Sequence, residues 1–222
     1  MKAVNKKICF IICVSDEELY NESLKYILNL NKTKDIEIEV LAIRKANSIA
    51  SGYNKAMRKS DAKYKVYLHQ DVFIINKNFI FDIIKLFDSN IQIGMIGVAG
   101  VDILPENGVW WESKSLVGGI YDSHTGTMEL YCWENNAQYR FVQAIDGVII
   151  VTQYDLPWRE DIFNGWHFYD ISQSLEFIKK GYALVVPNVS KSWAMHACGD
   201  KDIDRSYYKY KDIFIREYKD FI

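Results

Sequence analysis

Short apolar runs alternate with segments of helical periodicity through the first half of the chain. The run ICFIICV (8–14) is continuously apolar, which is typical of a strand covered on both faces. Similar or alternating patterns predict further strands at 36–43, 63–69 and 93–100, and helices at 15–30, 48–60 and 76–90. Strands and helices that alternate at this spacing indicate βαβ units and a largely parallel sheet.

Single residues predict where these helices begin, weaken or end. The turn SDEE (15–18) is typical of a helix start, with Ser15 as the N-cap and Glu18 as its capping-box partner. Gly52 weakens the helix expected at 48–60, because glycine inside a helix costs about 1 kcal/mol relative to alanine. Gly181 follows a periodic segment and is a typical helix stop.

The pattern changes after residue 100. Residues 101–136 are rich in turn residues and aromatics, which predicts loops and short antiparallel strands. We then expect a buried strand at 139–153, interrupted at Asp146 and Gly147, a helix at 167–181 and a strand at 182–187. No repeat or linker divides the sequence, so one shared core is expected.

Composition narrows the classes of function. The chain has 222 residues, 49% of them apolar, and a formal net charge of −2. Binding to a nucleic acid through neutralised phosphates is therefore not expected. The four cysteines form neither a C-x-x-C pair nor paired zinc half-sites, which favours free thiols in a reducing compartment. No stretch reaches the roughly 18–20 apolar residues that span a bilayer, so we expect a cytoplasmic protein.

Three polar residues interrupt the apolar stretch KVYLHQDVFI, directly after a predicted strand. They are His69, Gln70 and Asp71. A second polar turn, SDE (15–17), follows the first strand. Ligands of open α/β sheets bind beyond the carboxyl ends of the strands, so both turns are candidate ligand sites. An Asp there can hold a hard divalent ion that bridges phosphates, whereas the structural alternative for Asp71 is a turn cap.

Several motifs follow one another in a fixed order. They begin with the strand and polar turn at 8–18 and continue through ASGYNKAMRKSDAKYKVYLHQDV, an Asn-containing helix and a strand that ends in an acid. They end with the stretch 143–196, which contains an Asp-Gly strand, an acid at the start of a helix, a Gly-Tyr stop and a late His. In this order they resemble the GT-A glycosyltransferases of the family-2 type, especially the small StrF-like bacterial branch.

The resemblance implies an α/β fold with a single GT-A (Rossmann-like) domain over residues 1–222. Its central, mostly parallel mixed sheet would be flanked by helices. Within it we expect a nucleotide-binding half at 1–100, an acceptor-side half at 101–200 and a C-terminal helix at 201–222. The implied activity is an inverting, metal-dependent, hexosyltransferase-like transfer from a nucleotide-sugar, with a UDP-sugar favoured. The acceptor would be a glycan, a lipid-linked molecule or another hydroxyl compound, as in polysaccharide biosynthesis.

The resemblance also implies how a divalent ion is held. Asp71 matches the last acid of the Asp-x-Asp motif and would ligate Mn²⁺ or Mg²⁺ on the diphosphate. His69 replaces the first acid, and His196 matches a late His that completes the metal shell. Imidazole beside oxygen ligands suits Mn²⁺ better than Mg²⁺, while an ordinary hydrogen-bonded histidine is the alternative for His196. The expected donor-binding residues are Ser15, Asp16, Glu17, Asn54, His69, Gln70 and Asp71.

Two carboxylates are candidates for the general base, which takes the acceptor hydroxyl proton as that oxygen attacks the anomeric carbon. Asp170 matches the second member of the family's acidic pair, and Tyr169 stands where Glu is more common. The alternative for Asp170 is a favourable position in the helix dipole. Asp146 is the rival, because an acid inside a buried strand is costly unless it is hydrogen bonded or functional.

Aromatic residues gather in two segments that would flank the acceptor side. These residues are Trp110, Trp111, Trp166 and His167. Sugar rings have apolar faces that stack on aromatic rings, so we predict an acceptor platform, with core packing as the alternative. The glycines of GGIYDS (118–123) predict a mobile loop over the site.

Other interpretations stay open. The replaced acids at His69 and Tyr169 are compatible with an inactive GT-A-like protein that binds a nucleotide-sugar or glycan without turnover. A sugar-phosphate nucleotidyltransferase is less favoured, because the turn after the first strand is acidic and lacks glycine. A zinc hydrolase has little support, since the sequence contains no H-E-x-x-H motif.

The C-terminal segment 203–222 has apolar residues at helical spacing, with lysines and an arginine among them. This pattern predicts a helix packed on the domain. The alternatives are a homodimer contact or peripheral association with the inner face of the membrane, because acceptors of such enzymes are often lipid-linked.

Overall fold

The computed structural model describes residues 6–133, 137–188, 191–199 and 204–222. Strands and helices of the first half are β1 (Lys7–Val14), α1 (Glu17–Leu28), β2 (Glu37–Arg44), α2 (Ile49–Met57), β3 (Tyr64–Leu68), β4 (Val72–Ile74), α3 (Phe79–Ser89) and β5 (Ile93–Gly97). Those of the second half are β6 (Ala99–Val101), the 3-10 helix η1 (Trp110–Glu112), β7 (Leu116–Asp122), β8 (Glu129–Trp133), β9 (Tyr139–Val142), β10 (Ala144–Ile145), β11 (Ile149–Thr152), α4 (Tyr169–Lys179), β12 (Ala183–Pro187), β13 (Ala194–His196) and α5 (Arg205–Tyr218).

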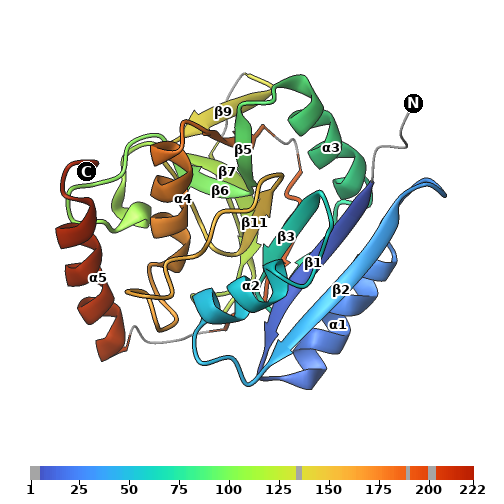
Figure 1. The fold of residues 1–222 in the computed structure, drawn as a ribbon, viewed down its shortest axis with the longest axis horizontal. Helices are drawn as coiled ribbons and strands as arrows, with labels where there is room; N and C mark the ends of the chain where they lie inside the picture. Colours follow the sequence, from blue (N-terminus) through green and yellow to red (C-terminus); the bar gives the residue numbers. More distant parts are fainter. Residues whose placement is uncertain (1–5, 134–136, 189–190, 200–203) are drawn as a thin grey trace.

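Two mixed sheets organise these strands (Figure 1). The larger has the order β2-β1-β3-β11-β5-β12-β9, and the smaller has the order β10-β6-β7-β13-β4, with β8 paired to β7. Strand β1 is parallel to β2 and β3, and β12 is parallel to β5. The predicted α/β fold with a mixed sheet flanked by helices is confirmed. The larger sheet is less parallel than expected, because β11 and β9 pair antiparallel with their neighbours.

The middle strands of the larger sheet are buried on both faces. Along β1, Ile8 and Phe10 pack with α1 and α3, whereas Cys9 and Ile11 pack with α2 and α4. The continuous apolar run of this strand is therefore explained, because successive side chains point into two different cores. Helix α5 lies beside α4 (Figure 1). Its buried aromatic residues share a core cluster with residues of α4.

Four local predictions are wrong. The strand expected at 139–153 is divided into β9, β10 and β11, of which β10 belongs to the smaller sheet. Asp16, not Ser15, is the N-cap of α1, because the Ser15 hydroxyl is hydrogen bonded to Gln70 instead. The strand expected at 93–100 is divided into β5 and β6, which belong to different sheets. The segment 118–123, expected as a mobile loop, lies largely in β7, which pairs with β6, β8 and β13.

The predicted C-terminal helix is confirmed as α5. Its inner face carries Tyr207, Tyr210, Phe214 and Tyr218, all of them buried. Ile203, which was expected on the same face, lies outside the described residues. Among the residues that the structure describes, no helix combines the length and apolar character needed to cross a membrane.

Helix α2 packs closely against β1 at Gly52, and a substitution there tests this close approach. A Cβ atom at Gly52 would overlap Sγ of Cys13 and would lie 3.1 Å from Cβ of Ala46. Replacing a helical glycine by alanine usually stabilises a protein, but overpacking costs about 1–3 kcal/mol. We therefore expect Gly52→Ala to lower the free energy of unfolding, measured by urea denaturation.

The same substitution in a Cys13→Ala background provides the control. Removing the sulfur relieves the main overlap, so we expect most of the loss caused by Gly52→Ala to disappear there. A stabilising effect of Gly52→Ala in the otherwise unchanged protein would contradict the close approach of the two elements.

Candidate functional site

Two adjoining cavities lie beyond the carboxyl ends of β1 and β3. The smaller, the strand-end cavity, has a volume of about 220 Å³ and is lined by Cys13, Ser15, Ile49, Tyr53, Leu68, His69, Gln70, Asp71 and Trp166. The other, the aromatic cavity, has a volume of about 400 Å³ and is lined by His69, Gly108, Trp110, Trp111, Asp146, Trp166, His167, Phe168, Tyr169, Asp170, Ile171, Asp204 and Tyr207. Because His69 and Trp166 line both, the two cavities share a wall.

A larger cavity, of about 780 Å³, includes residues that follow β4 and precede β13. It lies at the opposite end of these strands from Asp71 and His196. Its charged lining consists of Asp82 and three lysines, Lys77, Lys85 and Lys191. We therefore choose the candidate functional site by the chemistry of the residues that line the two adjoining cavities, and not by cavity volume.

Gln70 joins the ends of the two parallel strands. Its Oε1 atom accepts hydrogen bonds from the backbone N–H groups of Ser15 and Asp16, at 2.7 and 2.9 Å. Its Nε2 atom donates to the Ser15 hydroxyl at 3.0 Å. These contacts hold the turn after β1 against the turn after β3. Of the expected donor-binding residues, Ser15, His69, Gln70 and Asp71 line the strand-end cavity.

The other three expected donor-binding residues make structural contacts. Asp16 accepts the N–H groups of the first turn of α1 as its N-cap. Glu17 forms a two-pronged ion pair with Arg44, at 2.6 and 2.8 Å. Asn54 is buried, and both ends of its amide are hydrogen bonded to the backbone of Trp158 at 2.9 Å. We therefore leave these residues out of the proposed donor site.

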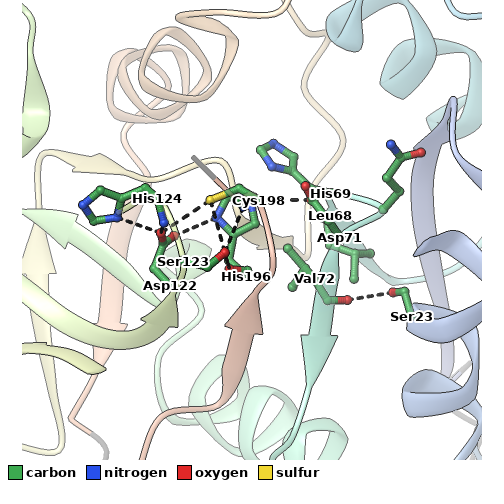
Figure 2. Close-up of polar contacts among 12 residues, drawn as sticks. Ser23, Leu68, His69, Asp71, Val72, Asp122, Ser123, His124, His196 and Cys198 are labelled. Carbon is green, nitrogen blue, oxygen red and sulfur yellow. Dashed lines mark hydrogen bonds and ion pairs between the residues drawn. The ribbon is translucent and has the colours of Figure 1, made fainter. Parts of the chain in front are cut away.

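Asp71, His69 and His196 form a group of potential metal ligands. One ligand atom from each lies within 4.8 Å of the others. The Nε2 atom of His196 is 3.5 Å from Oδ1 of Asp71, and Figure 2 shows the two side chains facing each other. Antiparallel pairing of β13 with β4 places His196 opposite Val72, the residue after Asp71. The strands themselves thus bring the two ligands together.

Asp122 orients His196 from the other side. Oδ2 of Asp122, at the end of β7, accepts a hydrogen bond from Nδ1 of His196 at 2.8 Å. Sequence reasoning missed Asp122, which is distant in the chain and lies in the segment expected as a loop. A carboxylate on one imidazole nitrogen fixes the tautomer and directs the other nitrogen, as is usual around metal-binding histidines.

The charges of this group reinforce one another. Burial lowers the pKa of His196, but its contacts with Asp122 and Asp71 raise that pKa to about 12. Burial would raise the pKa of Asp71, yet the hydrogen bond to His196 and the nearby His69 hold it well below its usual range. Two imidazoles with a carboxylate are a ligand set that suits a transition ion such as Mn²⁺. Ion binding there would displace the proton on the ligating His196 nitrogen.

His69 and Tyr169, the two positions where the resemblance implies acids, contact each other. Nε2 of His69 and the hydroxyl of Tyr169 form a hydrogen bond of 2.5 Å. Gly147 makes room for this contact, because a Cβ atom there would overlap the Tyr169 hydroxyl. Phe168, directly before Tyr169, has a positive φ of 61° and gives α4 no side-chain cap. Such strain in a residue other than glycine is frequent at functional sites.

Asp146 and Asp170 both line the aromatic cavity. Burial raises the pKa of Asp170, although backbone N–H groups, including that of Gly147 at 3.0 Å, oppose the shift. Burial, and then the charge of Asp170, raise the pKa of Asp146 to about 7. Because Asp170 accepts several backbone hydrogen bonds at the start of α4, the negative charge of the pair is better stabilised on Asp170.

The structure brings the four expected acceptor-side residues to the same cavity. Trp110 and Trp111 come from η1, while Trp166 and His167 precede α4. Trp111 and Trp166 remain 44% and 51% exposed, so their rings are available for stacking. Tyr207 of α5 also lines this cavity, and its buried hydroxyl has no partner among the described residues. It was predicted only as a core position of the helix.

Comparisons with known proteins identify the family and support the fold. A profile of the family described as "Glycosyltransferase like family" matches residues 9–218. A comparison with curated proteins finds no match. The fold is similar to that of S. aureus TarS 1–349 in complex with UDP, with a TM-score of 0.56 and 11% identity over 96% of this chain and 70% of that chain.

A second similar structure is the mannosyltransferase PcManGT from Pyrobaculum calidifontis in complex with GDP-Man and Mn²⁺. Its TM-score is 0.55, with 10% identity over 92% of this chain and 59% of that chain. At such identities the likeness establishes the fold, which is the GT-A fold that the motifs predicted. Together with the match over most of its length, this means that the chain belongs to the glycosyltransferase-like family.

Proposed function

We propose that this protein is an inverting, metal-dependent glycosyltransferase. It would move a sugar, in a hexosyltransferase-like reaction, from a nucleotide-sugar to a hydroxyl group of a glycan or lipid-linked acceptor. The observation that carries the proposal is the shared wall of the two cavities. Asp71, which contacts His196, lines the strand-end cavity on one side of His69. Asp146 and Asp170 line the aromatic cavity on the other side. A leaving diphosphate and an attacking hydroxyl need these two kinds of group on opposite sides of the sugar.

The strand-end cavity is the proposed donor site. Asp71 and His196, with His69 as a third ligand, would hold Mn²⁺ or Mg²⁺, and Mn²⁺ is favoured by the imidazoles. The bound ion would stabilise the negative charge that develops on the leaving diphosphate. Nucleotide-bound neighbours, one with UDP and one with GDP-Man and Mn²⁺, support a nucleotide-sugar donor. We favour a UDP-sugar.

Asp170 is the proposed general base, and the aromatic cavity is the proposed acceptor site. The Asp170 carboxylate lies in the first turn of α4 and accepts hydrogen bonds from backbone N–H groups. In its ionised form it would accept the hydroxyl proton of the acceptor. Asp146 remains protonated over more of the pH range because of its raised pKa. Trp111 and Trp166 would stack on the acceptor's sugar rings.

Several narrower inferences accompany this function as predictions. They are the StrF-like branch, the division at residues 100 and 200, a cytoplasmic location, and a role of α5 in dimer formation or membrane association. The hydrogen bond between His69 and Tyr169 favours one alternative, a protein that binds a nucleotide-sugar or glycan without turnover, because both residues replace expected acids.

Nucleotide binding tests the donor site. We expect UDP to bind more tightly than GDP, CDP or dTDP in the presence of Mn²⁺, as measured by isothermal titration calorimetry. Removing the ion with a chelator, or substituting Asp71→Asn, is expected to weaken UDP binding by roughly tenfold or more, because a metal ligand is lost.

The matched control is Asp88→Asn, which changes an exposed acid on α3. It is expected to leave UDP binding unchanged. UDP binding that is insensitive to both the chelator and Asp71→Asn would contradict the metal assignment. Tighter binding of another nucleotide would contradict the UDP assignment alone.

Turnover tests the assignment of the base. Asp170→Asn is expected to lower kcat by about 10²–10⁴-fold while UDP binding stays within roughly twofold, because a general base contributes a rate factor of that order. The readout is nucleotide release from a UDP-sugar with a saturating acceptor.

Asp146→Asn is the matched control, because asparagine imitates the neutral form of the rival acid in the same cavity. We expect it to lower kcat by less than about tenfold, since it removes no base. A large loss of kcat in Asp146→Asn, together with an active Asp170→Asn variant, would identify Asp146 as the general base instead of Asp170. UDP binding without turnover in the otherwise unchanged protein, for every acceptor tried, would favour the binding-only alternative.

A further inference from the structure

A second group of potential metal ligands surrounds Asp122 on the side away from Asp71 (Figure 2). Oδ1 of Asp122 accepts a hydrogen bond from Nδ1 of His124 at 2.7 Å and lies 3.5 Å from Sγ of Cys198. Oδ2 accepts the hydrogen bond from His196. Ligand atoms of Asp122, His196 and Cys198 all lie within 4.8 Å of one another. Thus two imidazoles and a thiol converge on one carboxylate.

The backbone holds this arrangement in place. Strand β13 runs parallel to β7, with His196 in register with Asp122. Ser123 then connects the two segments, because its N–H group donates to the carbonyl of His196 at 3.2 Å and its hydroxyl accepts from Gly199 N–H at 2.9 Å. The position of Cys198 therefore follows from strand pairing and from a turn that is hydrogen bonded on both sides of it.

The chemistry of the group differs from that of the proposed donor site. Thiolate, imidazole and carboxylate are the ligands of tetrahedral Zn²⁺ sites, whereas Mg²⁺ prefers oxygen ligands alone. Each proton that now bridges to Asp122 would leave when an ion takes its place. The side chains of Asp122 and His196 are 14% and 13% exposed, while that of His124 is 57% exposed. The group is therefore largely enclosed, and His124 lies on its exposed side.

We propose that Asp122, His124, His196 and Cys198 form a binding site for a thiophilic divalent ion such as Zn²⁺. The site goes beyond the proposed sugar transfer and does not depend on it. His196 links it to the Asp71 group, because Nε2 faces Asp71 and Nδ1 faces Asp122. An ion at Cys198 would bind Nδ1 of His196 and displace the proton that this nitrogen now donates to Asp122. With ions in both positions at once, both ring protons would be lost and His196 would bridge the ions as an imidazolate.

Cobalt spectroscopy tests the proposal without any nucleotide or turnover. The full-length, metal-free protein is titrated with Co²⁺ under reducing conditions. We expect one equivalent to produce visible bands of tetrahedral Co²⁺ and a near-ultraviolet band of thiolate-to-cobalt charge transfer. Zn²⁺ is expected to abolish both. Cys198→Ser should lose the charge-transfer band, and the matched control Cys132→Ser, which changes the exposed cysteine of β8, should keep it.

His124→Ala provides a second variant, and we expect it to fold normally because this side chain is exposed. We expect it to weaken Co²⁺ binding by roughly tenfold or more while the charge-transfer band persists at saturation. A protein without the charge-transfer band, or a band that survives Cys198→Ser, would overturn the proposal. Failure of UDP binding with an intact cobalt spectrum would instead overturn only the proposed function.

Discussion

The contact between Asp71 and His196 is the interaction on which the rest of the site depends. It exists because β4 and β13 pair antiparallel, which sets the residue after Asp71 opposite His196. The parallel pairing of β13 with β7 then brings Asp122 to the other imidazole nitrogen. One strand thus places a histidine between two carboxylates. The two carboxylates favour the protonated form of His196, which explains its raised pKa.

A second constraint lies at the start of α4. Tyr169 reaches His69 only because Gly147 has no side chain and because Phe168 adopts a left-handed backbone conformation. His69 and Tyr169 therefore form a coupled, hydrogen-bonded pair at positions where the resemblance implies acids. Asp71 is the carboxylate in contact with His196 on this side, and the imidazoles would favour a transition ion at the proposed metal site.

The sequence predicted the parts of this account that local pattern determines. The apolar run of β1 and the polar end of β3 located the sheet and Asp71, because burial on both faces leaves a clear signature. It could not predict the partnership of Asp122 with His196, which are 74 positions apart and meet only through strand pairing. Nor could it distinguish Asn54 from a ligand-binding residue, because a buried amide that holds the Trp158 backbone has the same local context. Nor could it predict that the Ser15 hydroxyl bonds to Gln70 instead of capping α1, because Gln70 is distant in the sequence.

We propose that an imidazole and a diphosphate coordinate the same ion beside Asp71. Pulsed electron paramagnetic resonance of the protein with one equivalent of Mn²⁺ and UDP measures this directly. The account predicts hyperfine coupling of the Mn²⁺ spin to both ¹⁴N of a coordinated imidazole and ³¹P of the diphosphate, with the ¹⁴N coupling lost in His69→Ala, His196→Ala double variants. A spectrum with ³¹P coupling but no ¹⁴N coupling in the unchanged protein would contradict it.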